Sequence, residues 1–120
     1  EFRRVLFRSL LELVLATGDP LALGCFSLTA LVLAPLFEET LFRGALLPVL
    51  ARRWGVGWGL LVSALSFAVA HLSLAELPAL LVLGLGLGWL RLRSGRLGCC
   101  VLMHGLWNSL TFANLLLLAG

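Results

Sequence analysis

The fold is decided by residues 21–37, which read LALGCFSLTALVLAPLF and contain no charged side chain. A helix needs roughly 20 apolar residues to cross the hydrocarbon of a bilayer, and about 17 suffice. Three further uncharged stretches follow at residues 54–75, 77–90 and 97–120. All but the stretch at 77–90 are long enough to span, and the aliphatic stem of Arg91 can extend that one. The sequence therefore predicts an all-α, polytopic transmembrane helix bundle.

The composition agrees with this prediction. Hydrophobic residues make up 61% of the 120 residues and charged residues only 12%, whereas soluble domains are about 45–50% apolar and about 25% charged. A soluble core of this size could not bury so much leucine, valine and alanine, but a lipid bilayer can surround them. The composition excludes an ordinary soluble domain and predicts an integral membrane protein.

The first nine residues, EFRRVLFRS, resemble the translation of a sequencing-adapter tail, and we interpret residues 1–9 as a non-native segment. Nine basic and six acidic residues give a net charge of +3; removing three arginines and one glutamate leaves six and five, or +1. That charge indicates no nucleic-acid partner. The alternative is the basic start of a signal or anchor segment, with Leu10–Thr17 as its short apolar part. Residues 10–120 are the predicted bundle.

Turn and helix signals divide the bundle. We expect helices over residues 21–34, 35–53, 56–72, 78–92 and 100–118, with a break or bend at Pro35 and a milder bend at Pro48. A straight helix over residues 21–53 would extend about 50 Å, too long for a hydrocarbon core of roughly 30 Å. Gly84 and Gly88 form a G-x-x-x-G seam on which another helix can pack closely.

The arginines predict the orientation. Arg52 and Arg53 end one predicted helix, and the cluster of Arg91, Arg93 and Arg96 follows two spans later, so both clusters lie on one side of the membrane. The positive-inside rule makes that side cytoplasmic. Arginine without lysine favours a prokaryotic source, hence a prokaryotic plasma membrane. The three cysteines have no spacing typical of a disulfide framework or a thiolate metal site: Cys25, Cys99 and Cys100.

Six polar side chains lie within the apolar segments: Glu38, Glu39, Arg43, His71, His104 and Asn108. A charge at the centre of a spanning helix costs roughly 2.5–3.5 kcal/mol on insertion scales, so such residues face the bundle interior and mark functional sites. The pairs at i and i+4 share a helix face. Read one at a time, the residues could instead be an ion pair, a complement to a helix end, or hydrogen-bonded core histidines.

Three motifs carry a family resemblance. Glu38-Glu39-Thr40-Leu41-Phe42-Arg43 fits E-E-x-x-x-R, residues 67–71 fit F-x-x-x-H, and residues 104–108 fit H-x-x-x-N. In this order, on separate helices, they resemble the CPBP (Abi) intramembrane proteases, which include the type II CAAX prenyl endopeptidases. The resemblance covers about residues 30–110. Members of this family usually have more helices upstream, so residues 10–120 are expected to be a fragment of the catalytic bundle.

The resemblance implies a reaction. Glu38 would activate water with help from His71, and His104 and Asn108 would polarise the scissile carbonyl and stabilise its oxyanion. Two adjacent carboxylates resist ionising together, so Arg43 is expected to stabilise the charge on Glu39 and leave Glu38 as general base. The implied substrate is a membrane-embedded or membrane-tethered peptide.

A metal-free mechanism is the favoured interpretation, with no cofactor required. Zinc bound by Glu38, His71 and His104 is the alternative, although H-E-x-x-H is absent. Two other functions stay open: a transporter or proton-relay subunit that uses the same buried groups, and an inert binding protein of the bacteriocin-immunity type. Helical rise from Arg96 would leave His104 too shallow, so an extended entry through Gly95 and Gly98 is expected to bring it to the depth of Glu38.

Overall fold

The computed structural model describes the backbone of residues 2–119 and the side chains of residues 8–118. Across these residues it is helical and contains no strand. The helices, in chain order, are α1 (Phe2–Thr17), α2 (Pro20–Leu28), η1 (Thr29–Leu33), α3 (Ala34–Glu39), η2 (Thr40–Leu46), α4 (Leu47–Trp54), α5 (Val56–Ala70), α6 (Leu77–Ser94) and α7 (Leu97–Ala119), where η marks a π-helical segment. The predicted all-α bundle is confirmed. The predicted non-native tail is residues 1–9, and the side chains of residues 1–7 lie outside the described part of the chain.

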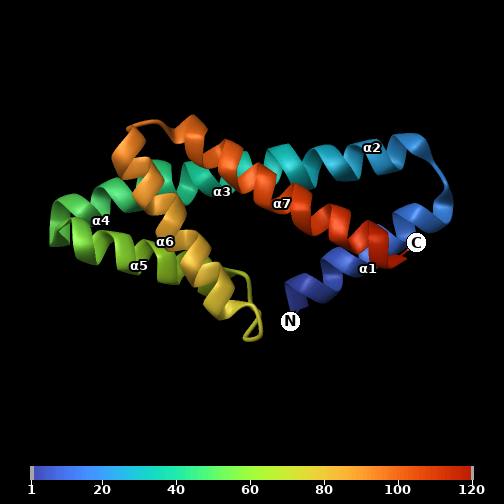
Figure 1. The fold of residues 1–120 in the computed structure, drawn as a ribbon, viewed down its shortest axis with the longest axis horizontal. Helices are drawn as coiled ribbons and strands as arrows, with labels where there is room; N and C mark the ends of the chain where they lie inside the picture. Colours follow the sequence, from blue (N-terminus) through green and yellow to red (C-terminus); the bar gives the residue numbers. More distant parts are fainter. Residues whose placement is uncertain (1, 120) are drawn as a thin grey trace.

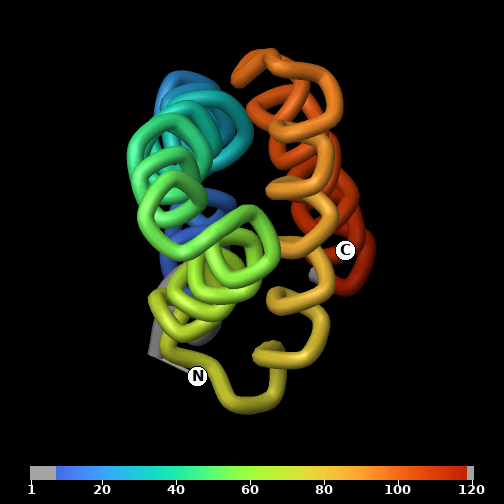
Figure 2. Tube along the Cα trace, turned by 90° about the vertical axis from the view of Figure 1, so that its left-hand side faces the viewer, coloured from blue at the N-terminus to red at the C-terminus, as the bar shows by residue number. Residues whose placement is uncertain are grey.

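Three helical stretches are long and apolar enough to cross a membrane: Pro20–Trp54, Leu77–Ser94 and Leu97–Leu118. Helix α7 packs against α3 and η1 and diverges from α2 toward the C-terminus, while α6 is inclined more steeply to the long axis of the molecule (Figures 1 and 2). The turn between α4 and α5 and the turn between α6 and α7 lie at the same end of this axis, away from the marked C-terminus (Figure 1). Both arginine clusters border these turns, so they share one end of the bundle, as the sequence predicts.

Of the break or bend expected at Pro35, the break does not occur, because the chain stays helical from Pro20 to Trp54. The run begins at Asp19, whose Oδ1 accepts a hydrogen bond from the Leu21 N–H at 3.0 Å, with Pro20 in the first turn. Both arrangements are favourable at a helix start, where N–H groups have no partner within the helix.

Two π-helical segments allow this helical run to contain Pro35 and Pro48 without a break. The η1 segment directly precedes Ala34-Pro35, and η2 precedes Leu47-Pro48. The Ala34 N–H donates to Thr29 O, and the Leu47 N–H donates to Phe42 O, so each bond spans five residues instead of four. A proline ring clashes with the carbonyl four residues earlier in a regular α-helix. The wider turn relieves that clash, and each proline then occupies the first turn of the next α segment.

The remaining helices differ from the sequence expectations at their ends. Although residues 54–75 are uncharged, α5 has only 15 residues, because the chain turns after His71 and Leu72 has φ +56°. In contrast, α6 reaches 18 residues and ends at Gly95, whose φ of +69° suits glycine. The expected extended entry to the last helix is also wrong: α7 already begins at Leu97, and Gly98 lies within it.

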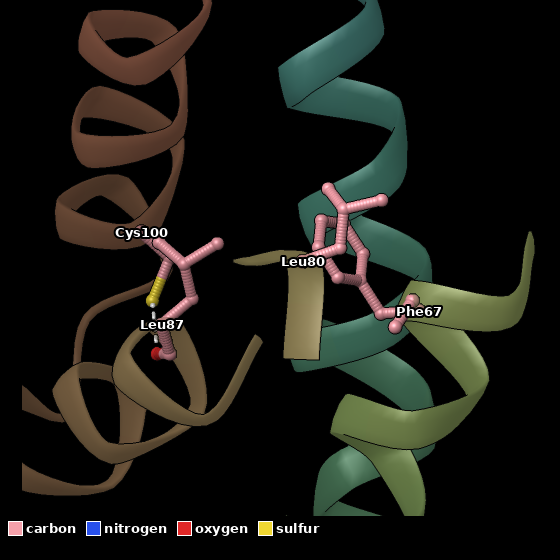
Figure 3. Close-up of a cluster of buried hydrophobic side chains, with 5 residues drawn as sticks. Phe67, Leu80, Leu87 and Cys100 are labelled. Carbon is pink, nitrogen blue, oxygen red and sulfur yellow. Dashed lines mark hydrogen bonds between the residues drawn. The ribbon is translucent and has the colours of Figure 1, made fainter. Parts of the chain in front are cut away.

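Close helix packing depends on glycines. Gly84 lies against Ala64 of α5, and Gly88 lies against Leu60, so the predicted G-x-x-x-G seam is confirmed. A buried apolar cluster adjoins this seam; four of its members are labelled in Figure 3: Phe67, Leu80, Leu87 and Cys100. The Cys100 thiol donates to Leu87 O at 3.3 Å, which joins the start of α7 to α6.

The α4–α5 hairpin offers a matched pair of substitutions. A Cβ at Gly59 would lie 2.6 Å from the backbone nitrogen of Ala51, whereas a Cβ at Gly57 would meet nothing within 4 Å. We expect Gly59→Ala to lower the free energy of unfolding by about 1–3 kcal/mol through overpacking, and Gly57→Ala to leave it unchanged or slightly raised. Thermal melts of both variants in the same detergent measure the difference. Equal melting temperatures would contradict the close approach of α4 and α5.

Candidate active site

The predicted site residues come from four parts of the fold. Glu38 and Glu39 end α3, and Arg43 lies in η2 one turn later. His71 follows the last residue of α5, while His104 and Asn108 lie on α7. The first five converge in the bundle interior. Asn108 bonds elsewhere, to η1.

Glu39 is the centre of a buried charged cluster. Its Oε2 accepts a hydrogen bond from Arg43 Nη1 at 3.0 Å and lies 2.7 Å from His104 Nδ1. The side chains of Glu39 and Arg43 are fully buried. A carboxylate oxygen only accepts, so His104 Nδ1 carries a proton and donates it to this bond. Arg43 also donates from Nη2 to Gly84 O at 3.1 Å, which connects the cluster to α6.

Glu38 faces two imidazoles. Its Oε2 lies 3.5 Å from His104 Nε2 and 3.9 Å from His71 Nε2. His71 Nδ1 lies 2.8 Å from Phe67 O, and since a carbonyl only accepts, Nδ1 carries the proton. In the neutral ring Nε2 is then an acceptor directed at Glu38. The structure thus brings Glu38 and His71 within reach of one water. Unlike Glu39, both keep some exposure, 15% for Glu38 and 18% for His71.

Phe67 is a contact that the sequence interpretation did not assign to the site. Its fully buried ring lies edge-on to His71 and His104, with centroid distances of 4.7 and 5.6 Å. The Arg43 guanidinium carbon lies 4.3 Å from the same ring centroid, within the range of a cation–π contact. Phe67 thus fixes three polar side chains at once. The sequence signal was its place in the F-x-x-x-H motif, one turn before His71.

Asn108 bonds to the backbone of the first long helix. Its Nδ2 donates to Ala30 O at 3.0 Å in η1, eight residues before Glu38. Nothing in the sequence motif indicates this partner, because a backbone carbonyl has no residue signature. The amide has a second N–H, so the bond to Ala30 uses half of its donor capacity.

The residues named for a zinc alternative do not form a metal site as they stand. Within residues 8–118 the structure places no group of three or more His, Cys, Asp or Glu side chains so that they could hold a metal ion. The imidazoles of His71 and His104 instead flank one oxygen of Glu38. We therefore derive no chemistry through a metal.

The fold and the site together define a class of protein. It is a polytopic membrane protein in which carboxylate, imidazole and guanidinium groups form a buried cluster between helices that can cross a bilayer. A family model described as "Type II CAAX prenyl endopeptidase Rce1-like" matches residues 20–110. The chain belongs to this family, a family of endopeptidases, and is an integral membrane protein.

One relative among curated proteins is described as an "Uncharacterized 24.3 kDa protein" from Escherichia coli. It is 44% identical over 82 residues, which are 64% of this chain and 38% of the relative. The chain therefore matches well under half the length of that protein. No solved structure matches the chain.

Proposed function

We propose that the protein is an intramembrane endopeptidase that hydrolyses a peptide bond with water activated by Glu38 and His71. The observation that supports this most is the position of Glu38: a carboxylate oxygen at the edge of a buried cluster, flanked by the Nε2 atoms of two histidines. A general base must lie within hydrogen-bond reach of the water that it deprotonates, directly or through one water. Family membership supports the same reaction class.

In the proposed reaction, a water bound between Glu38 and His71 gives one proton to the Glu38 carboxylate. The water oxygen attacks the carbonyl carbon of the scissile bond, and the carbonyl oxygen becomes an oxyanion. Glu38 then transfers its proton to the amide nitrogen, the C–N bond breaks, and the products are a carboxyl group and an amine. His71 Nε2 accepts from the second water hydrogen and so orients the oxygen for attack.

The oxyanion is stabilised from α7. Protonated His104 donates from Nε2, and the second N–H of Asn108 is the other proposed donor. A preplaced oxyanion donor contributes about 2.7–4 kcal/mol in enzymes where one has been removed. Glu39 supports His104 through the bond to Nδ1, and Arg43 balances the charge of Glu39. As in a catalytic triad, a carboxylate orients the imidazole, although here the imidazole is the oxyanion donor and Glu38 is the base.

The proposed substrate is a membrane-embedded or membrane-tethered peptide, because the site lies between helices that are mostly lipid-facing. No metal is part of the proposal. A proton relay is the rival function. A relay would distribute its titratable groups along a path, whereas Glu38, Glu39, Arg43 and His104 form one contact cluster.

The test uses the purified chain in liposomes with a library of membrane-tethered peptides. Mass spectrometry should find one new carboxyl terminus per cleaved peptide, and a zinc chelator such as 1,10-phenanthroline should leave the rate unchanged. A pH-sensitive dye in the same liposomes should report no proton flux. Loss of cleavage with chelator, restored by zinc, would overturn the metal-free mechanism. Proton flux without cleavage would establish the relay.

We also propose that the end bearing Arg52-Arg53 and Arg91–Arg96 faces the cytoplasm of a prokaryotic cell, as the positive-inside rule requires. Single cysteines introduced at Arg53 and at Asp19, in a variant lacking native cysteines, should react with an impermeant thiol reagent from opposite sides of the membrane. Labelling of position 53 from outside intact cells would reverse this orientation.

A further inference from the structure

The π-helical segment η1 leaves backbone carbonyls without their usual donors. In a regular α-helix the Ala34 N–H would donate to Ala30 O, but here it donates to Thr29 O. The donor expected for Leu31 O is residue 35, which is proline and has no N–H. Pro35 is also the residue that a five-residue bond would pair with Ala30 O. Neither pattern therefore supplies Ala30 O with a backbone donor from Ala34 or Pro35.

Helix α7 lies against both of these carbonyls. Asn108 Nδ2 donates to Ala30 O at 3.0 Å. One turn earlier on α7, Gly105 approaches Leu31 O so closely that a Cβ there would lie 3.0 Å from this oxygen. Lipid offers no hydrogen-bond donors, so a carbonyl freed within a spanning helix needs a partner from another helix. His104, adjacent to Gly105, bonds to Glu39 on the same helical run.

We propose that the Ala30 carbonyl, freed by Pro35, is a positioning acceptor that orients the Asn108 amide and fixes the depth of α7 against α3. Pro35 acts because it has no N–H: neither Ala34 nor Pro35 donates to Ala30 O, so this oxygen accepts from the Asn108 amide and holds it toward η1. The contacts of Asn108, Gly105 and His104 then set the register between the two helices. The catalytic part of this inference rests on the proposed function, whereas the structural part does not.

A double-mutant cycle between Asn108→Ala and Pro35→Ala tests the structural part. In the wild-type background, Asn108→Ala should lower the folding equilibrium constant about threefold to twentyfold, the range found for hydrogen bonds between membrane helices. Alanine at position 35 restores an N–H, which in the five-residue pattern of η1 would donate to Ala30 O and take the place of the Asn108 amide. In that background Asn108→Ala should cost less than about twofold. Reversible unfolding in mixed micelles measures all four proteins, and equal costs in both backgrounds would overturn the proposal.

A kinetic comparison tests the positioning role. Pro35→Ala should not destabilise the helix, since alanine is the better helix former. It should nevertheless lower kcat about tenfold or more with KM unchanged, because the loosened amide no longer aims its second N–H. Pro20→Ala is the control, since Pro20 opens α2 and frees no carbonyl within a helix; its kcat should equal that of wild type.

If Pro35→Ala keeps the wild-type kcat, Ala30 does not position Asn108 for catalysis. If wild type cleaves no peptide at all, the proposed function fails, and the stability cycle still decides whether Asn108 replaces the donor that Pro35 lacks.

Discussion

Glu38→Gln is expected to abolish peptide hydrolysis while the protein stays folded and inserted. Glutamine keeps the size of the side chain and can still form hydrogen bonds near His71 and His104. It cannot take a proton from water. Proton transfer by a positioned side chain contributes about 10²–10⁴-fold to the rate, so the fall in kcat should be at least about a hundredfold. Product formation in the liposome assay gives the rate, and thermal melts of the same preparations show that the fold is retained.

Glu12→Gln is the matched control for this change. Glu12 is an exposed glutamate of α1, remote in the chain from the site, whose partner is Arg8. Its substitution should change neither kcat nor the melting temperature. Glu38→Asp keeps a carboxylate on a side chain one methylene shorter, so it should retain part of the activity. Cleavage by Glu38→Gln at the wild-type rate would show that Glu38 is not the base, and the proposed reaction would be wrong.

Glu39→Gln is expected to lower the free energy of unfolding by about 3–5 kcal/mol, because it leaves Arg43 as a buried cation without its counter-charge. Arg43 is fully buried, and besides Glu39 it donates only to the carbonyl of Gly84 in the described hydrogen bonds. Activity should fall as well, since Glu39 holds His104 Nδ1. Chemical unfolding in detergent measures the first effect, and kcat of the folded fraction measures the second.

The pair of Arg8 and Glu12 controls for burial. It has the same i, i+4 spacing as the pair of Glu39 and Arg43, but its side chains are 65% and 62% exposed. Glu12→Gln should therefore cost less than about 0.5 kcal/mol. Replacing Glu39 and Arg43 together by leucine should recover much of the stability, as for other buried ion pairs, but no activity. Equal costs for Glu39→Gln and Glu12→Gln would contradict the buried cluster.

Features that depend on local chemistry could be read from the sequence. Three of the four uncharged stretches lie in the helices that are long enough to span, and the stretch at 54–75 forms the shorter α5. The helix expected from residue 21 begins at Pro20, and Gly84 with Gly88 predicts the seam against α5. The π-helical segments could not be read, because proline shows only that a regular helix is disturbed. Whether the chain breaks or widens by one residue depends on what packs beside it. Here Gly105 and Asn108 approach from α7, more than 70 residues later in the chain.

The contacts of the site also divide into those that local helix geometry predicts and those that depend on how distant helices pack. Glu39 and Arg43 are one turn apart, so helix geometry alone predicts their contact. The bond between Glu39 and His104 joins residues 65 positions apart and depends on how α7 lies across α3. A depth counted along each helix placed His104 too shallow, because that count assumes helices standing parallel. Figure 1 shows α6 and α7 both inclined to the helical run from α2 to α4, so distance along a helix does not measure depth.

The wide turn at η1 has a consequence for how this stretch tolerates changes of length. Successive residues of an α-helix are rotated by about 100°. A π turn contains one residue more than an α turn, so deleting one residue from Thr29–Leu33 could close η1 to a regular α-helix and keep the direction in which α2 faces. Deleting one residue from the regular part of α2 would instead rotate the residues before it by about 100° relative to the carboxylates of α3, and apolar side chains that now face lipid would turn inward. Loss of a residue at the exposed position Val32 should therefore be tolerated better than loss of a residue within Pro20–Leu28.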